Sequence, residues 1–276
     1  MRPLFAYFRT YWTATKSPWY LLSILALAAL LVYANYAYRL EAQWVRGVSG
    51  WGARFPRACL LYALPYWAAF GLQHLFMRGV HRSYLIILIA PILFGLQSTL
   101  PIHGLTALYT LRSCCLIIPV IVFWLLRDRG RQSLYGLQQP DTWSYYPYLL
   151  LAMIPLLWYA AGQPDFLLMY PRAKMRGAAP LALFEGSYGL DLFSMEFFFR
   201  GFLILGMADK DRAHAVLPMA LFYCTVHFGK PMAECVSSLF GGLLLGIIAL
   251  ESRSIYVGVL LHLCLAWGLE VWAAMH

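Results

Sequence analysis

The residues best suited to chemistry in this chain are charged or titratable side chains inside strongly apolar segments. Glu196 and Arg200 are one helical turn apart, so a helix would place them on the same face. Their apolar surroundings make both charges costly unless they face each other or other polar groups. The pair therefore predicts either a structural ion pair in a helix bundle or a carboxylate that an arginine orients within a polar site.

Two histidines accompany this pair on other segments. His227 lies where one apolar segment ends, just before Gly229, and His262 lies in the middle of the last apolar segment. A single buried histidine commonly does no more than hydrogen-bond a neighbouring carbonyl. Together with Glu196, however, the two place one carboxylate and two imidazoles on three separate helices. Such a set can polarise a water molecule and stabilise an oxyanion.

The order of these motifs resembles the CAAX-protease and bacteriocin-processing family of intramembrane proteases, which includes the type II CAAX prenyl endopeptidases. That family carries Glu-Glu-x-x-x-Arg, Phe-x-x-x-His and His-x-x-x-Asn on separate membrane helices. The resemblance covers roughly residues 145–276. The segments that carry it here are Met195-Glu196-x-x-x-Arg200, Tyr223-x-x-x-His227 and His262-x-x-x-Ala266.

The resemblance implies an intramembrane endopeptidase that cleaves a membrane-associated protein or peptide, in a bacterial inner or cytoplasmic membrane. Its catalytic residues would be Glu196, Arg200, His227 and His262. Glu196 and His227 would act on a water molecule, Arg200 would orient Glu196, and His262 would face the developing oxyanion. We expect no cofactor and no metal. The alternative is a zinc site of two histidines and one carboxylate, although the chain has no HExxH motif.

Two positions depart from the family pattern. Met195 stands where the family has its first Glu, which is thought to activate the water, and Ala266 stands where it has Asn. The only asparagine in the chain is Asn35, far away in the first apolar segment.

These departures leave three alternatives open. Glu196 takes over as base, or Glu234 does so from the segment that follows His227. In the third alternative, the protein is a catalytically silent family member that binds or stabilises a membrane partner. A proton-coupled transporter that uses Glu196 as a relay is a further hypothesis, against which the chain shows no internal repeat.

The composition indicates what must position these residues. The chain is 62% hydrophobic and only 12% charged, against about 25% charged residues in a soluble domain. A lipid bilayer can solvate that much apolar surface. The net charge of +9 comes from basic residues scattered between apolar segments. This distribution favours loops that face anionic lipid headgroups and excludes a nucleic-acid-binding stripe.

We therefore predict an all-α fold, a polytopic transmembrane bundle of about eight or nine membrane helices. Residues 1–145 would form N-terminal transmembrane helices, and residues 146–276 the protease-like domain. The predicted spans are 18–38, 57–77, 83–100, 106–126, 146–163, 187–207, 213–228, 232–250 and 254–274. Basic residues in the loops slightly favour an N-terminus on the inside.

Overall fold

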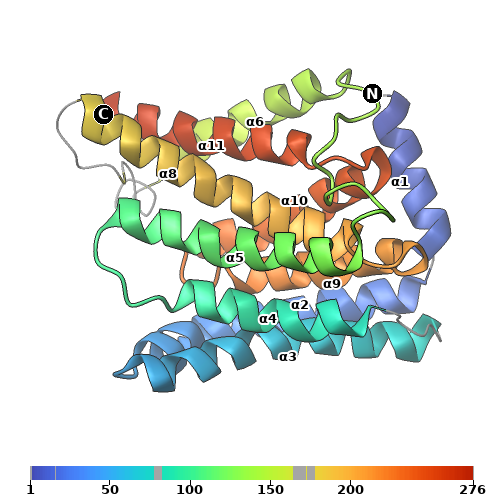
Figure 1. The fold of residues 1–276 in the computed structure, drawn as a ribbon, viewed down its shortest axis with the longest axis horizontal. Coiled ribbons are helices and arrows are strands. Elements are labelled where there is room, and N and C mark those ends of the chain that lie inside the picture. The colour runs from blue at the N-terminus through green and yellow to red at the C-terminus, as the bar shows by residue number, and fades with distance from the viewer. Residues whose placement is uncertain (1, 16, 78–82, 164–171, 173–177, 276) are drawn as a thin grey trace.

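The protein is a bundle of helices, most of which run side by side along the long axis of the molecule (Figure 1). The structure is a computed structural model that describes residues 2–15, 17–77, 83–163, 172 and 178–275. The first half comprises α1 (Arg2–Thr15), α2 (Pro18–Tyr38), the π-helix η1 (Glu41–Arg46), α3 (Trp51–Met77), α4 (Tyr84–Ser98) and α5 (Leu105–Arg127). The second half comprises α6 (Tyr146–Ala161), α8 (Ala178–Glu196), the π-helix η2 (Phe197–Leu205), α9 (Asp209–Thr225), α10 (Met232–Ser252) and α11 (Tyr256–Met275).

The predicted all-α fold is confirmed for the described residues, and each predicted span coincides with one of these helices or with α8 and η2 together. Three described helices are both long and apolar enough to cross a membrane: α2, α5 and α10. Three shorter apolar helices lie within α4, α6 and α11. The number of eight or nine spans therefore stays a prediction.

The two predicted regions, 1–145 and 146–276, pack closely against each other. Helix α5 lies along α8, and α3 lies along α9. One hydrophobic core extends from Tyr7 in α1 to Leu261 in α11. The second half is therefore held in place by the first, and the division between them stays a prediction.

The long helix that carries Glu196 changes its winding at that residue. The α-helical turns of α8 end at Glu196, and the π-helix η2 begins at Phe197. Every residue of η2 is buried, and the ring of Phe199 packs edge-on against Tyr223 of α9 at 5.0 Å between centroids. Single π-helical turns are rare and often mark functional positions. The change of winding thus sets where Glu196 and Arg200 lie in the core.

Candidate active site

Glu196 and Arg200 form an ion pair in the interior of the bundle. Arg200 Nη1 lies 2.8 Å from Glu196 Oε1, and the two side chains are 1% and 0% exposed. The pairing expected from their spacing is therefore confirmed. Burying either charge alone would carry a large free-energy cost. Each charge offsets part of that cost for the other.

His262 of α11 contacts the same carboxylate oxygen. Its Nδ1 lies 2.8 Å from Glu196 Oε1, and its Nε2 lies 3.0 Å from the hydroxyl of Tyr223. Both ring nitrogens thus face polar partners, which fixes the orientation of the imidazole. The contacts that Glu196 Oε1 makes with Arg200 and His262 are close but lie outside hydrogen-bond geometry.

Tyr223 contacts both Arg200 and His262, a role that was not predicted from the sequence. Its hydroxyl meets His262, and the guanidinium of Arg200 lies over its ring at 4.3 Å from the centroid. A cation at this distance from an aromatic face is attracted to it. The signal available in the sequence was a tyrosine where the family motif has Phe, because the extra hydroxyl adds a polar group to the site.

His227 lies in the turn just after α9 and contacts the same tyrosine. Its Nδ1 is 2.8 Å from the backbone carbonyl of Tyr223, and the two rings lie 4.7 Å apart. A carbonyl can only accept a hydrogen bond, so Nδ1 carries the proton and Nε2 is the acceptor nitrogen of the neutral ring. The structure places the Glu196 carboxylate on His262 and connects His227 to Tyr223. The expected joint action of Glu196 and His227 on one water molecule stays a prediction.

The carboxylate of Glu196 also packs directly on the backbone of α11. A Cβ atom at Gly258 would lie 2.1 Å from Glu196 Oε2. Within the described part of the chain, Oε2 of Glu196 and Nε of Arg200 have no hydrogen-bond partner. Buried polar atoms with unused capacity are uncommon in a folded core and are typical of sites that bind or react.

Replacing Gly258 by Ala is expected to lower stability by about 1–3 kcal/mol, because the new methyl group displaces a buried, ion-paired carboxylate. Gly241→Ala is the matched control, since a Cβ there meets nothing within 4 Å and α10 should gain about 0.5–1 kcal/mol. The measurement is thermal unfolding of both variants in one detergent. Equal melting temperatures for the two variants would contradict the close packing of Glu196 on Gly258.

The remaining predicted site residues occupy other surroundings. Glu234, the alternative base, forms an ion pair with Lys230 across the first turn of α10. Met195 is partly buried against the main core. Ala266 belongs to a separate apolar cluster with Tyr109, Phe184 and Tyr188. Ala266 therefore packs among apolar side chains at the position where the family has Asn.

No three His, Cys, Asp or Glu residues in the described part of the chain are grouped so that they could hold a metal ion. The site brings together one carboxylate and His262, and His227 contacts the Tyr223 that joins them. The metal-free site stays a prediction.

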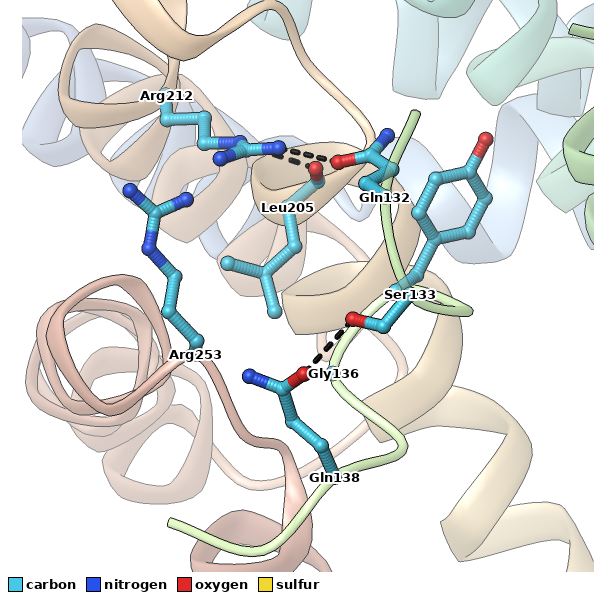
Figure 2. Close-up of a pocket in the computed structure, with 8 residues that line it drawn as sticks. Gln132, Ser133, Gly136, Gln138, Leu205, Arg212 and Arg253 are labelled. Atoms are coloured by element: carbon cyan, nitrogen blue, oxygen red, sulfur yellow. Dashed lines mark hydrogen bonds between the residues drawn. The ribbon is translucent and has the colours of Figure 1, made fainter. Parts of the chain in front are cut away.

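A separate pocket of about 240 Å³ lies at the end of η2 (Figure 2). Its lining combines apolar surface with polar side chains and two arginines. The lining residues are Gln132, Ser133, Tyr135, Gly136, Gln138, Leu205, Arg212 and Arg253. The Nε of Arg212 donates to the carbonyls of Leu205 and Met207 at 3.0 and 3.1 Å, and its Nη2 donates to Gln132. Arg212 thus ties the loop after α5 to the end of η2. The candidate catalytic residues do not line this pocket.

The comparisons with known proteins agree with the resemblance drawn from the motifs. Residues 187–268 match the family model of the type II CAAX prenyl endopeptidase Rce1-like proteins. The matched segment contains Glu196, Arg200, His227 and His262. Comparison with curated proteins gave no match, and neither did comparison with solved structures. The match and the apolar helices together support an integral membrane protein related to a family of proteases.

Proposed function

We propose that this protein is an intramembrane endopeptidase that hydrolyses a peptide bond in a membrane-associated protein or peptide. The observation that carries the proposal is the convergence of Glu196, Arg200 and His262 with Tyr223 inside the segment that matches the protease family. A carboxylate held by an arginine and shared with a histidine is a common means of preparing an imidazole for proton transfer.

In the proposed reaction, His227 acts as the base. Its Nε2 takes a proton from a water molecule as the water oxygen attacks the carbonyl carbon of the substrate. The resulting tetrahedral intermediate carries a negative oxygen. In the proposal, the Tyr223 hydroxyl donates to this oxygen while it accepts a hydrogen bond from Nε2 of His262. When the carbon–nitrogen bond breaks, the proton on His227 passes to the leaving amine, so that His227 returns to its starting state.

Glu196 supports this reaction through His262. Its carboxylate, held in place by Arg200, orients the imidazole of His262. This assignment retains the roles expected from the sequence for Arg200, His227 and His262. It moves Glu196 from direct action on the water to support of His262, which acts on the oxyanion through the Tyr223 hydroxyl. Glu234 stays the alternative base.

The proposed substrate is defined by its place in the bilayer. The catalytic groups lie within a bundle of apolar helices, so a substrate must approach from the membrane or from its surface. The matched family is described by its action on prenylated proteins, and for this chain we propose only a membrane-associated protein or peptide. The proposed location is the inner or cytoplasmic membrane of a bacterium.

A second candidate function is that of a silent family member that binds a membrane partner. Two observations favour it: Met195 replaces the family's first Glu, and Ala266, which lies in an apolar cluster, replaces its Asn. In that case the ion pair of Glu196 and Arg200 serves only to hold the bundle together.

Purified protein in lipid nanodiscs is expected to cleave members of a library of membrane-anchored peptides, whereas Glu196→Ala should cleave none. Mass spectrometry of the products checks this expectation. A chelator added to the wild type should leave cleavage unchanged, because we expect a metal-free site. If wild type and variant are equally inactive across a broad library, the silent member becomes the better description. Cleavage that a chelator abolishes would contradict the metal-free mechanism.

A further inference from the structure

The turn that carries His227 is held by residues from the opposite half of the chain. Asn35, near the end of α2, donates from Nδ2 to the backbone carbonyl of Phe228 at 3.0 Å. Its neighbour Tyr36 donates from its hydroxyl to the carbonyl of Lys230 at 2.7 Å. These two carbonyls flank Gly229, so the turn is fixed on both sides of its most exposed residue.

The need for such partners follows from the end of a helix. The last carbonyls of a helix are not followed by another helical turn. They, and the carbonyls of the turn after the helix, therefore lack a backbone N–H that could donate a hydrogen bond to them. Here α9 ends at Thr225 and α10 begins only at Met232. The amide of Lys230 bonds to the carbonyl of His227 at 2.9 Å, which closes the turn. The carbonyls of Phe228 and Lys230 take their donors from α2 instead.

The amide of Asn35 can be oriented in only one way. Its Oδ1 accepts a hydrogen bond from the backbone N–H of Glu41 at 3.1 Å, while its Nδ2 donates to Phe228. Rotating the amide by half a turn would set a donor against an N–H and an acceptor against a carbonyl. The side chain is only 3% exposed, so solvent offers little compensation. Asn35 therefore connects η1, α2 and the turn in one defined arrangement.

The π-helix η1 also contacts the turn that carries His227. Arg46 extends over Gly229, where an added Cβ would lie 2.2 Å from Arg46 Nη2. Arg46 is itself paired with Glu41 at 2.5 Å. Glu41 thus provides the backbone N–H that orients Asn35 and the carboxylate that holds Arg46.

We infer that Asn35 and Tyr36 are positioning residues, which act on His227 by fixing the turn that begins at its own backbone. The inference rests on the proposed function, in which Nε2 of His227 must meet a water molecule in a defined place. Both residues lie outside the matched segment, 187–268. The first half of the chain is thereby part of the site and does more than enclose it. The only asparagine in the chain, expected to be far from the motifs, lies next to one of them.

The test compares Asn35→Ala and Tyr36→Phe with Tyr20→Phe. Tyr20 is the matched control because it also lies on α2 and donates its hydroxyl to a backbone carbonyl, that of Ala69 on α3, at 3.4 Å. In the first two variants, the backbone amides of residues 226–230 should exchange with solvent about three to ten times faster. The ring nitrogen signals of His227 should shift, and kcat should fall while KM stays close to the wild-type value. Tyr20→Phe should leave all three readouts unchanged.

Two results would overturn the inference. One is unchanged exchange and unchanged His227 signals in both Asn35→Ala and Tyr36→Phe. The other is an equal change in Tyr20→Phe, which would indicate general loosening of α2. Tyr36→Phe removes a single oxygen atom, so it tests the turn even where Asn35→Ala fails to fold. If the wild type cleaves no peptide, the proposed function fails, and the exchange and histidine signals still decide whether α2 positions the turn.

Discussion

Replacing Glu196 by Gln is expected to lower kcat for peptide cleavage by about 10²–10⁴-fold, the usual contribution of a group that supports proton transfer. The amide keeps nearly the same shape but loses the charge that faces His262 Nδ1 at 2.8 Å. The matching substitution Glu234→Gln should leave kcat within a few-fold of the wild type, since Glu234 is paired with Lys230 at the start of α10. Both variants are measured on any peptide that the wild type cleaves.

The other outcomes of this comparison are equally informative. Loss of activity in Glu234→Gln alone would move the base to Glu234 and leave Glu196 with a structural role. Full activity in both variants would end the carboxylate mechanism altogether. Because Glu196→Gln leaves the Arg200 charge without its buried partner, thermal unfolding of each variant must be recorded beside its activity.

Replacing Arg200 by Ala should destabilise the protein by about 3–5 kcal/mol, because it leaves an uncompensated carboxylate in a site with no solvent exposure. It also removes the guanidinium that lies over the ring of Tyr223. Arg253→Ala is the control, since Arg253 is 48% exposed and its nearest carboxylate oxygen lies 3.8 Å away, so it should cost less than about 1 kcal/mol. Denaturant or thermal unfolding in detergent measures both variants.

A double variant separates charge from packing in this prediction. Glu196→Gln combined with Arg200→Met removes both charges and keeps similar volumes, so it should recover much of the stability that Arg200→Ala loses. It should stay inactive, because the site needs the carboxylate. If Arg200→Ala unfolds at the temperature of the wild type, the pair of Glu196 and Arg200 contributes nothing to folding.

Local sequence patterns predicted the contacts of the site that form within a single helix. The spacing of Glu196 and Arg200 predicted their ion pair, because residues one turn apart share a face of any helix. The apolar segments likewise predicted where the helices lie, because lipid requires each segment to satisfy its own backbone. What the spacing left open was which histidine meets Glu196. That contact joins two helices far apart in the sequence, and the structure gives it to His262.

The residues that the sequence did not reveal all act across helices. Gly258 is a glycine in an apolar helix, and only the packing shows that Glu196 lies against it. Asn35 belongs to the first apolar segment, and its contact with Phe228 spans most of the chain. The π-helical winding after Glu196 has no local sequence signature of the kind that a proline or a capping residue provides. Such features depend on tertiary packing, which a single sequence does not show.

The most direct test of the proposed hydrolysis is to run the cleavage reaction in heavy-oxygen water and to weigh the products by mass spectrometry. Attack by a water molecule held at His227 places one heavy oxygen atom in the new carboxyl terminus of the peptide. We predict this label in the wild type, no product in His227→Ala, and no label in the fragment that begins with the new amino terminus. Peptide cleaved at the wild-type rate by His227→Ala, or products without heavy oxygen, would contradict water activation at this site.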